Sequence, residues 1–472
     1  KEPRTLALYL GLLHEALRSG ENTFMISLEE WSEKLRFKRR LLGWFLLNDM
    51  RRHLDFLKNR YSLMDWEEIE KGKIRVALKP VVSDEKIKVP KTLIEAGYLK
   101  TLSAKTLFVY LIVLYKAQID AIGLRTSSFR KTLSNGTERK TFMVCKNHER
   151  AIQFALEKLL EDHALTKLSE IRAVAHRIVH GGKKFVKITK INRFNLGRLE
   201  KLSKLAPLHN PANIACLKAC RKILWHADHY AIFDTAFHST LPEKAFLYGL
   251  PYKLYKKEGI RRYGFHGISH EYVSREAAGL LKKKSAKIIS CHIGNGVSVT
   301  AVQDGKSLDT SMGFTPLEGP MMGTRSGSID PAIIFHLATT MPLSKIQNLL
   351  ERESGFKGLS GISSDIRDLY RKANSAGSKR VFEVFSYQMA KTILGMTAAF
   401  GGGTPDAIVF TAGIGENAFY LRSSICKYLA VIGLELDEAA NRRNAQQINS
   451  KNSKIKVLVL KTDEDLAMAK KI

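Results

Sequence analysis

The chain has 472 residues, of which 44% are hydrophobic and 26% are charged. These fractions are close to the average of globular proteins, so they exclude global disorder, and the length suggests about two to four domains. Lys and Arg number 76 against 46 Asp and Glu, a formal net charge of +30, which favours anionic partners: nucleic acid, a membrane surface or phosphorylated metabolites.

The cysteines and the apolar runs indicate where the protein acts. There are five cysteines, an odd number without CxxC spacing, namely Cys145, Cys216, Cys220, Cys291 and Cys426. This pattern argues against a disulfide framework or a cysteine-based zinc site and fits a reducing cytoplasm. The longest apolar run, residues 107–114, is far shorter than the ~20 residues that span a bilayer, and no signal peptide is apparent. We expect a soluble, cytoplasmic protein that is not bound to a membrane.

Residues 1–100 are predicted to be mainly helical. The expected order is a helix over 6–17, a strand over 23–26, a helix after Ser27, a helix over about 40–59, and a β-hairpin of 61–66 with 74–78. Ser27 with Glu30 three residues later has the pattern of a capping box. Helices followed by a hairpin are typical of a winged-helix module, and the segment vaguely resembles the winged-helix half of plasmid replication initiators.

A basic stretch within this segment has two interpretations. Between residues 34 and 60 lie nine basic residues and two acids. They form either a solvated helix surface or a face that binds DNA phosphates. The sequence leaves both interpretations open.

A polar connector over residues 80–100, with Pro80 and Pro90, separates this segment from an α/β pattern that begins at about residue 101. Two predicted strands in that pattern end in glycine-rich segments. Residues 293–298 follow the strand predicted over 288–292, and residues 411–417 follow the one predicted over 407–410. Glycines after a buried strand are often only a turn, but two such segments at strand ends are what a split nucleotide cradle needs.

Arginine, aspartate and histidine residues mark a candidate anion site. Arg177 lies beside a Gly-Gly bend, and Arg325 lies between glycines that leave room for an anion. Asp234 ends the strand predicted over 231–233, where a carboxylate is either a catalytic group or a cap. His266, in Arg-Tyr-Gly-Phe-His-Gly, is a proton carrier, a metal ligand or a satisfied half-buried histidine.

From about residue 116 to the C-terminus, the chain closely resembles the acetate kinase family of the actin-like ATPase superfamily. The segments that carry the resemblance include His176-Arg-Ile-Val-His-Gly-Gly, Ala206-Pro-Leu-His-Asn-Pro-Ala-Asn, Phe233-Asp-Thr-Ala-Phe-His, His292-Ile-Gly-Asn-Gly, Met322-Gly-Thr-Arg-Ser-Gly and Thr411-Ala-Gly-Ile-Gly-Glu-Asn. They occur in the family's order. The resemblance implies two actin-like (RNase H-like) α/β lobes, over residues 101–238 and 239–472, after a 1–100 extension outside the family.

The resemblance also implies roles for single residues. Asp234 matches the family's catalytic carboxylate, His266 and Arg325 match the groups that stabilise the transferring phosphoryl group, and Arg177 matches the arginine that binds the acid and its phosphate. The matches to the acid's apolar pocket are Val179, Leu208, Phe265 and Pro316. The matches to the ATP site are His292, Ile293, Gly294, Asn295, Gly296, Asp365, Ile366, Arg367, Gly413, Ile414, Gly415, Glu416 and Asn417. Glu464 matches the acidic residue associated with magnesium.

The resemblance breaks at the start of the first lobe. The family has a phosphate loop, Asn-x-Gly-Ser-Ser-Ser-x-Lys, where this chain has Thr101-Leu-Ser-Ala-Lys-Thr. The loss of preorganised donors predicts slow turnover.

The expected activity is a reversible, magnesium-dependent transfer of phosphate from ATP to acetate by direct in-line attack, giving ADP and acetyl phosphate. Mn²⁺ could replace Mg²⁺, and a homodimer is expected from the family. Two alternatives stay open. One is a kinase for propionate or another short acid, and the other is a catalytically weak chimera whose residues 1–100 bind nucleic acid.

Overall fold

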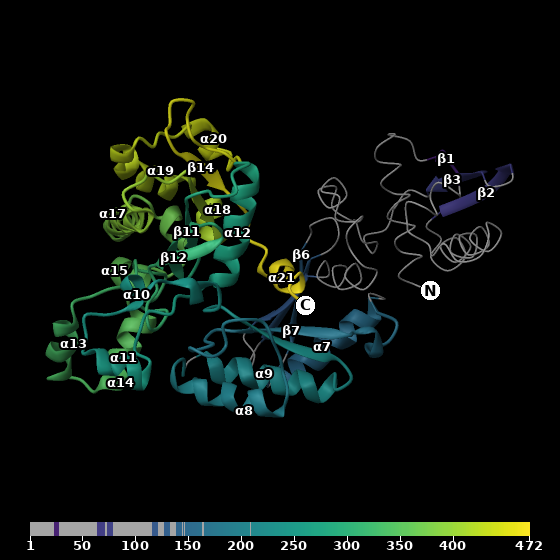
Figure 1. Cartoon of the computed structure of the whole chain (residues 1–472), viewed down its shortest axis with the longest axis horizontal. Coiled ribbons are helices and arrows are strands. Elements are labelled where there is room, and N and C mark those ends of the chain that lie inside the picture. The colour runs from purple at the N-terminus through teal and green to yellow at the C-terminus, as the bar shows by residue number, and fades with distance from the viewer. Residues whose placement is uncertain are drawn as a thin grey trace. The chain divides into compact units, whose positions relative to one another are not determined.

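A computed structural model describes residues 23–27, 64–70, 73–78, 116–120, 127–132, 138–143, 145, 147–162, 165–207 and 209–472 (Figure 1). The chain forms two compact units. The first comprises Lys1–Arg172 with Lys222–His226, and the second comprises Ala173–Arg221 with Ala227–Ile472.

The first unit contains a small antiparallel sheet near the N-terminus. Its strands are β1 (Thr23–Ser27), β2 (Met64–Glu70) and β3 (Lys73–Leu78), in the order β1-β3-β2. The predicted strand and hairpin are therefore confirmed. The helices predicted over 6–17, after Ser27 and over 40–59, and the connector over 80–100, lie outside the described residues.

A second antiparallel sheet of this unit runs in chain order. It consists of β4 (Lys116–Asp120), β5 (Ser127–Thr132) and β6 (Glu138–Met143). Helix α7 (His148–Glu161) follows and is capped by the side chain of Asn147, which accepts a hydrogen bond from the Arg150 amide at 2.9 Å. Phe154 of α7 packs edge-on against the buried Phe129 of β5, so α7 packs against this sheet.

The second unit opens with a three-stranded sheet in the order β7-β9-β8. Strands β7 (Ala173–Ile178) and β9 (Asp228–Phe233) are parallel, and the short β8 (Thr189–Lys190) pairs antiparallel with β9. Helices α8 (Arg193–Lys201) and α9 (Asn210–Ile223) bury Leu199 and Leu217 in one cluster with Ile178 and Phe233. The carboxyl ends of β7 and β9 therefore lie side by side at one edge.

A five-stranded sheet forms the centre of the second unit. In the order β12-β11-β10-β13-β14, its strands are β12 (Lys306–Thr310), β11 (Val297–Gln303), β10 (Ile288–Ile293), β13 (Ala407–Thr411) and β14 (Lys456–Val459). Strands β10, β13 and β14 are parallel. Every residue of β10 and β13 is buried, as expected for strands covered on both faces.

Helices cover both faces of this sheet. Helix α12 (Gly267–Leu280) packs on one face, where Val273 and Ala277 meet Ile288 and Val409. Helices α17 (Ala376–Met396) and α19 (Phe419–Tyr428) pack on the other. Because side chains alternate along a strand, β10 directs Ile289 and Cys291 into the larger cluster.

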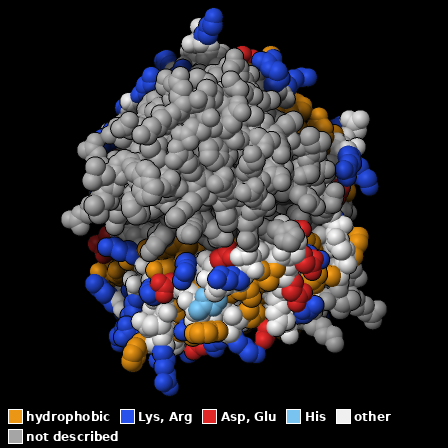
Figure 2. Space-filling view, turned by 90° about the vertical axis from the view of Figure 1, so that its right-hand side faces the viewer, with side chains coloured by type: hydrophobic (Ala, Val, Ile, Leu, Met, Phe, Trp, Pro, Cys, Tyr) orange, Lys and Arg blue, Asp and Glu red, His pale blue; other side chains and the backbone are white. Residues whose placement is uncertain are grey.

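Short helices fill the remaining connections. They are α10 (Glu243–Phe246), α11 (Tyr252–Glu258), α13 (Pro331–Ala338), α14 (Leu343–Asn348), α15 (Gly355–Ser360), α16 (Ile366–Arg371), α18 (Ala412–Asn417), α20 (Glu438–Arg442) and α21 (Glu464–Ala469). Within the described ranges no helix is both long and apolar enough to cross a membrane. On the described part of the face in Figure 2, Lys and Arg side chains are interspersed with acidic and hydrophobic ones.

Candidate functional site

The parallel pairing of β7 and β9 brings Arg177 and Asp234 together. Ile178 is in register with Phe233, and the Asp234 amide donates to the Ile178 carbonyl at 3.1 Å. Arg177 Nε and Nη2 donate to the two carboxylate oxygens of the buried Asp234, both at 2.9 Å. This bidentate geometry is the strong form of an arginine–carboxylate contact.

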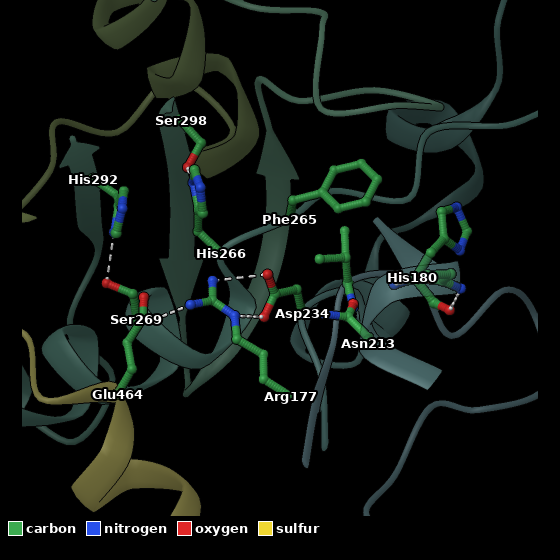
Figure 3. A network of polar contacts seen from close by, with 12 residues as sticks. Arg177, His180, Asn213, Asp234, Phe265, His266, Ser269, His292, Ser298 and Glu464 are labelled. Carbon is green, nitrogen blue, oxygen red and sulfur yellow. Dashed lines mark hydrogen bonds and ion pairs between the residues drawn. The ribbon is translucent and has the colours of Figure 1, made fainter. Parts of the chain in front are cut away.

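Glu464, the first residue of α21, lies on the other side of the same guanidinium. It accepts from Arg177 Nη1, so Arg177 lies between two carboxylates (Figure 3). The charge of Asp234 raises the pKa of Arg177, while burial raises the pKa of the Glu464 carboxyl. Sequence positions 177, 234 and 464, all predicted as site residues, therefore form one cluster.

His266 is held against this cluster by an unusual backbone conformation. It has a φ of 55°, in the left-handed region, and the next residue, Gly267, starts α12. The Gly267 amide donates to the backbone carbonyl of Asp234 at 2.9 Å. A non-glycine residue at positive φ is uncommon and tends to occur at functional sites.

The ring of His292 packs against the ring of His266. The ring stacks on His292 of β10, with 4.1 Å between the ring centroids. His292 Nδ1 lies 2.8 Å from the hydroxyl oxygen of Ser269. His292, predicted as the first residue of the ATP-binding segment 292–296, is the fifth residue of β10, and its ring lies against that of His266.

Arg325 converges on the same place from the loop before α13. Its Nη1 donates to the Pro316 carbonyl at 3.3 Å and contacts Met322 Sδ at 3.7 Å. A methyl group built on Gly296 would lie 3.2 Å from His266 Nε2 and 3.4 Å from Arg325 Nη1. His266, Arg325 and the backbone at Gly296 therefore surround one small space.

The two glycine-rich segments meet at one edge of the central sheet. His292 is in register with Thr411 on the parallel strands β10 and β13, so the segments that follow these strands are neighbours. Gly294, Asn295 and Gly296 form the hairpin turn between β10 and β11. After β13, the segment predicted as a loop over 413–417 belongs to the one-turn helix α18.

The other residues predicted for the ATP site differ in accessibility. The side chains of Ile293 and Ile366 are buried, so only their backbone could contact a ligand. Asp365 caps α16 and forms an ion pair with the exposed Arg367. The Tyr420 hydroxyl donates to the Ile366 carbonyl at 3.4 Å, which links α16 to α19, the helix after α18.

The residues predicted for the acid pocket are partly brought together. Val179 packs against the buried cluster that contains Phe265. The Pro316 carbonyl contacts Arg325. Leu208 lies outside the described residues.

Three residues near the site were missed in the sequence analysis. Asn213 Oδ1 accepts from the Val179 amide at 3.2 Å, and the Asn210 side chain bonds both backbone groups of His180. Burial and, after it, the charge of Arg325 lower the pKa of His209, which is also sensitive to Asp234. The segment Leu-His-Asn-Pro-Ala-Asn, which supplies all three, was noted only for its family resemblance.

Several buried histidines of the second unit have lowered pKa values. Burial is the main cause, and it lowers the pKa to about 3 at His176 and His292, to about 4 at His180 and His238, and well below 6.5 at His266 and His270. These rings are neutral at pH 7. His266 can therefore donate a hydrogen bond there without carrying a charge.

We expect the protein to lose stability in mild acid because of these rings. Below about pH 6.5 these histidines bind protons in the unfolded chain but not in the folded chain. Their contribution to the free energy of unfolding is therefore fully present above pH 6.5 and falls as the pH drops toward 4. Each ring contributes up to about 1.4 kcal/mol per pH unit. Urea unfolding at pH 7.5, 6 and 5 measures the slope. Equal unfolding free energies at pH 7.5 and 5 would contradict the expectation.

Comparison with known proteins identifies the family of this chain. The family model described as the acetokinase family matches residues 103–470. The chain belongs to the acetokinase family. The match starts 13 residues before the boundary expected at 116, and residues 1–102 lie outside it.

Acetate kinases from other organisms align with most of the region that the family model matches. The chain is 47% identical over 368 residues to "Acetate kinase" of Carboxydothermus hydrogenoformans, which covers 76% of this chain and 92% of the relative. It is 44% identical over 369 residues to "Acetate kinase" of Halothermothrix orenii, with the same coverage. The family assignment makes the chain a kinase that uses ATP as co-substrate.

Solved structures of acetokinase relatives share the fold. A propionate kinase from Francisella tularensis superposes with a TM-score of 0.71 at 38% identity, covering 75% of this chain and 91% of that one. Porphyromonas gingivalis acetate kinase superposes with a TM-score of 0.70 at 37% identity, covering 75% and 92%. The α/β fold of the matched residues is therefore that of acetate kinases, the actin-like ATPase type.

Proposed function

We propose that this chain transfers the γ-phosphoryl group of ATP to acetate, giving ADP and acetyl phosphate, and that it also catalyses the reverse reaction. One observation carries the proposal: Arg177, Asp234, His266 and Arg325 converge beside the Gly294–Gly296 turn. A carboxylate oxygen of acetate attacks the γ-phosphorus in line, and the bond from phosphorus to the β,γ-bridging oxygen breaks. Positive and neutral donors around the equatorial oxygens stabilise this transition state.

The roles of the residues follow from their chemistry. Acetate is already ionised at neutral pH, so its attack needs no general base, and Asp234 acts by orienting the Arg177 fork. Arg325 and His266 donate hydrogen bonds to the transferring group. The turn at Gly296 and helix α18, at the ends of parallel strands, lie where the ATP phosphates and nucleoside would bind, with Asp365 and Arg367 at the adenosine.

The carboxylates of the site suit a magnesium ion. Mg²⁺ is commonly held by one or two carboxylates together with substrate phosphates. Glu464 and Asp234 approach the same guanidinium and offer this type of ligand. When bound there, Mg²⁺ or Mn²⁺ would neutralise charge on the phosphates of ATP.

A coupled assay of acetyl phosphate formation by the full chain tests the proposal. Activity should depend on ATP, acetate and Mg²⁺. A chain that binds ATP but forms no acyl phosphate from acetate or propionate would exclude it.

We expect a low rate from the full chain that improves when the family's opening segment is restored. Residues 101–106 lie outside the described residues, and their sequence lacks the Asn, the Gly and the following Lys of the family's phosphate loop. Replacing residues 1–109 by the family's strand and Asn-x-Gly-Ser-Ser-Ser-x-Lys loop should raise kcat by about 10²-fold or more. Full-chain activity as high as that of a complete relative would contradict the expectation.

We expect acetate to be preferred over propionate modestly and over butyrate strongly. Val179, Phe265 and Pro316 are all larger than alanine, so the pocket around the methyl group is small. One extra methylene is worth about 1–3 kcal/mol in such a pocket. Val179→Ala should narrow the difference in kcat/KM between acetate and propionate, whereas Val431→Ala, at a valine that is 78% exposed, should not. A parental preference for butyrate would overturn the pocket assignment.

A homodimer is the assembly we propose. Helix α13 has no buried residue although it reads Pro-Ala-Ile-Ile-Phe-His-Leu-Ala. Ile333, Phe335 and, on α14, Leu343 are exposed to 44%, 73% and 69%. An exposed apolar patch of this kind typically marks a protein interface. Sedimentation of the full chain and of Phe335→Glu tests this assembly.

We also propose the domain division and location expected from the sequence. Two lobes, over 101–238 and 239–472, are supported by the separate sheets β7-β9-β8 and β12-β11-β10-β13-β14. A cytoplasmic location is supported by the five cysteines, which are all free thiols.

A second candidate function concerns residues 1–100. The sheet order β1-β3-β2 places the early strand beside the hairpin, as in a winged-helix module, and supports DNA binding by the basic stretch over 34–60. The affinity of the full chain for duplex DNA should then fall steeply with salt. Binding that is absent at low salt would exclude this function.

A further inference from the structure

A buried polar layer lies between α12 and the β10–β11 hairpin. Strand alternation directs Ser290 and His292 of β10 away from the larger core cluster, and Ser298 is in register with His292. The first turn of α12 supplies Ser269 and His270. All of these side chains are buried, so their hydrogen bonds are made within the protein.

The layer contains a continuous hydrogen-bonded chain that ends at His266. Ser290 Oγ lies 2.9 Å from His270 Nδ1, and His270 Nε2 lies 2.7 Å from Ser298 Oγ. Ser298 Oγ lies in turn 2.8 Å from His266 Nδ1. Figure 3 shows Ser298 next to the His266 ring.

The two end groups of this hydrogen-bonded chain, Ser290 and His266, determine the direction in which its hydrogen bonds are donated. Each serine has one hydroxyl proton, and each neutral imidazole carries one N–H. If His266 Nδ1 donated to Ser298, Ser298 would donate to His270 and His270 to Ser290, and the Ser290 proton would need a further acceptor. Among the described residues, Ser290 Oγ has no hydrogen-bond partner other than His270. A buried hydroxyl proton without an acceptor costs about 1–3 kcal/mol, so this direction is disfavoured.

In the opposite direction every group is satisfied. The Ser290 hydroxyl donates to His270 Nδ1, His270 Nε2–H donates to Ser298, and the Ser298 hydroxyl donates to His266 Nδ1. The proton of His266 is then on Nε2, the atom that faces Gly296 and Arg325. Phosphoryl oxygens are acceptors, so this tautomer presents a donor to them and the other one would present a lone pair.

We propose that Ser298 and His270 are positioning residues that fix neutral His266 in its Nε2–H tautomer, so that it donates to the transferring phosphoryl group. The tautomer follows from the hydrogen-bonded chain alone, whereas its effect on turnover rests on the proposed kinase function. The groups that face His266 oppose its protonation: His292 on β10, His270 on α12, Arg177 on β7 and Arg325 in the loop before α13. His266 therefore does not gain donor capacity by becoming charged, and the tautomer decides whether it can donate at all.

The direct test is the tautomeric state of His266 in the full chain. Nitrogen-15 NMR of protein labelled at histidine distinguishes a protonated from an unprotonated ring nitrogen, and loss of one signal in His266→Gln assigns the ring. At pH 7.5 we expect Nε2 protonated and Nδ1 unprotonated. A proton on Nδ1, or on both nitrogens, would overturn the proposal, and this measurement does not need an active enzyme.

Ser298→Ala should remove the preference of His266 for the Nε2–H tautomer. The His266 signals should become those of a tautomer mixture, and kcat should fall about tenfold while the KM values change little, because binding contacts are retained. Ser298→Thr keeps the hydroxyl and should keep the single tautomer. The control is Ser386→Ala, at a buried serine of α17 whose hydroxyl has no partner among the described residues.

The outcomes separate this inference from the proposed function. A single Nε2–H tautomer that persists with parental kcat in Ser298→Ala would overturn the role of Ser298. An inactive parent chain with the expected tautomer would count against the kinase function and leave the hydrogen-bonded chain intact.

Discussion

Arg177→Ala and Arg325→Ala are each expected to lower kcat/KM by about two orders of magnitude or more. Arg325 Nη1 lies by the space that His266 and Gly296 border, and Arg177 is held there by Asp234. Each variant removes a donor that meets the charge developing on the phosphoryl oxygens, and one preorganised donor typically contributes ~10²–10³ in rate. Steady-state kinetics with ATP and acetate measure the loss, on the chain with a restored opening loop if the natural chain is too slow.

The two variants should differ in stability, which tells their roles apart. Arg177→Ala leaves the carboxylate of Asp234 buried without its ion-pair partner, a change that typically costs about 3–5 kcal/mol. The cost should be at the lower end because the Arg177 side chain is 37% exposed. Arg325 forms no ion pair within the described part of the chain, so its loss should affect activity far more than unfolding. Arg275→Ala, at an arginine that is 76% exposed on α12, is the control, and near-parental activity of either site variant would show that the site is assigned wrongly.

The sequence predicted those parts of the site that depend on short patterns. Apolar runs followed by glycine located β10 and β13, and their parallel pairing brings the two segments together as expected. Asp234 was placed correctly at a strand end. These features follow from neighbouring residues, so the chain order alone is sufficient to find them.

What the sequence could not predict depends on contacts between distant segments. The ion pair between Arg177 and Glu464 joins residues 287 apart, and only the packed fold shows that the two carboxylates share one guanidinium. The interpretation of His266 as a satisfied half-buried histidine and its interpretation as a phosphoryl-stabilising group are both compatible with the geometry. Nδ1 is satisfied by Ser298, and Nε2 faces the space beside Arg325.

Ser290, Ser298 and His270 were not singled out because their significance depends on burial. Serine and histidine within predicted strands and helices ordinarily indicate surface positions. Here both faces of β10 are covered, so the polar residues of one face become a hydrogen-bonded layer. In residues 1–100 the three strands were predicted correctly, and the helices remain predictions.

Gly267→Ala is expected to lower kcat/KM by about 10²-fold or more, although it adds only one methyl group. Gly267 donates its amide to the Asp234 carbonyl, and a β-carbon there would overlap that carbonyl oxygen and crowd Phe237. The start of α12 must move to relieve the overlap, which carries His266 away from Asp234 and Arg325. A misplacement of about 1 Å can cost 10²-fold in rate.

Gly279→Ala is the matched control on the same helix. Nothing lies within 4 Å of its β-carbon, so activity should be retained and helix propensity should add up to about 1 kcal/mol of stability. Kinetics and urea unfolding of both variants test this, and equal activity of the two would show that the contact between Gly267 and Asp234 does not position His266.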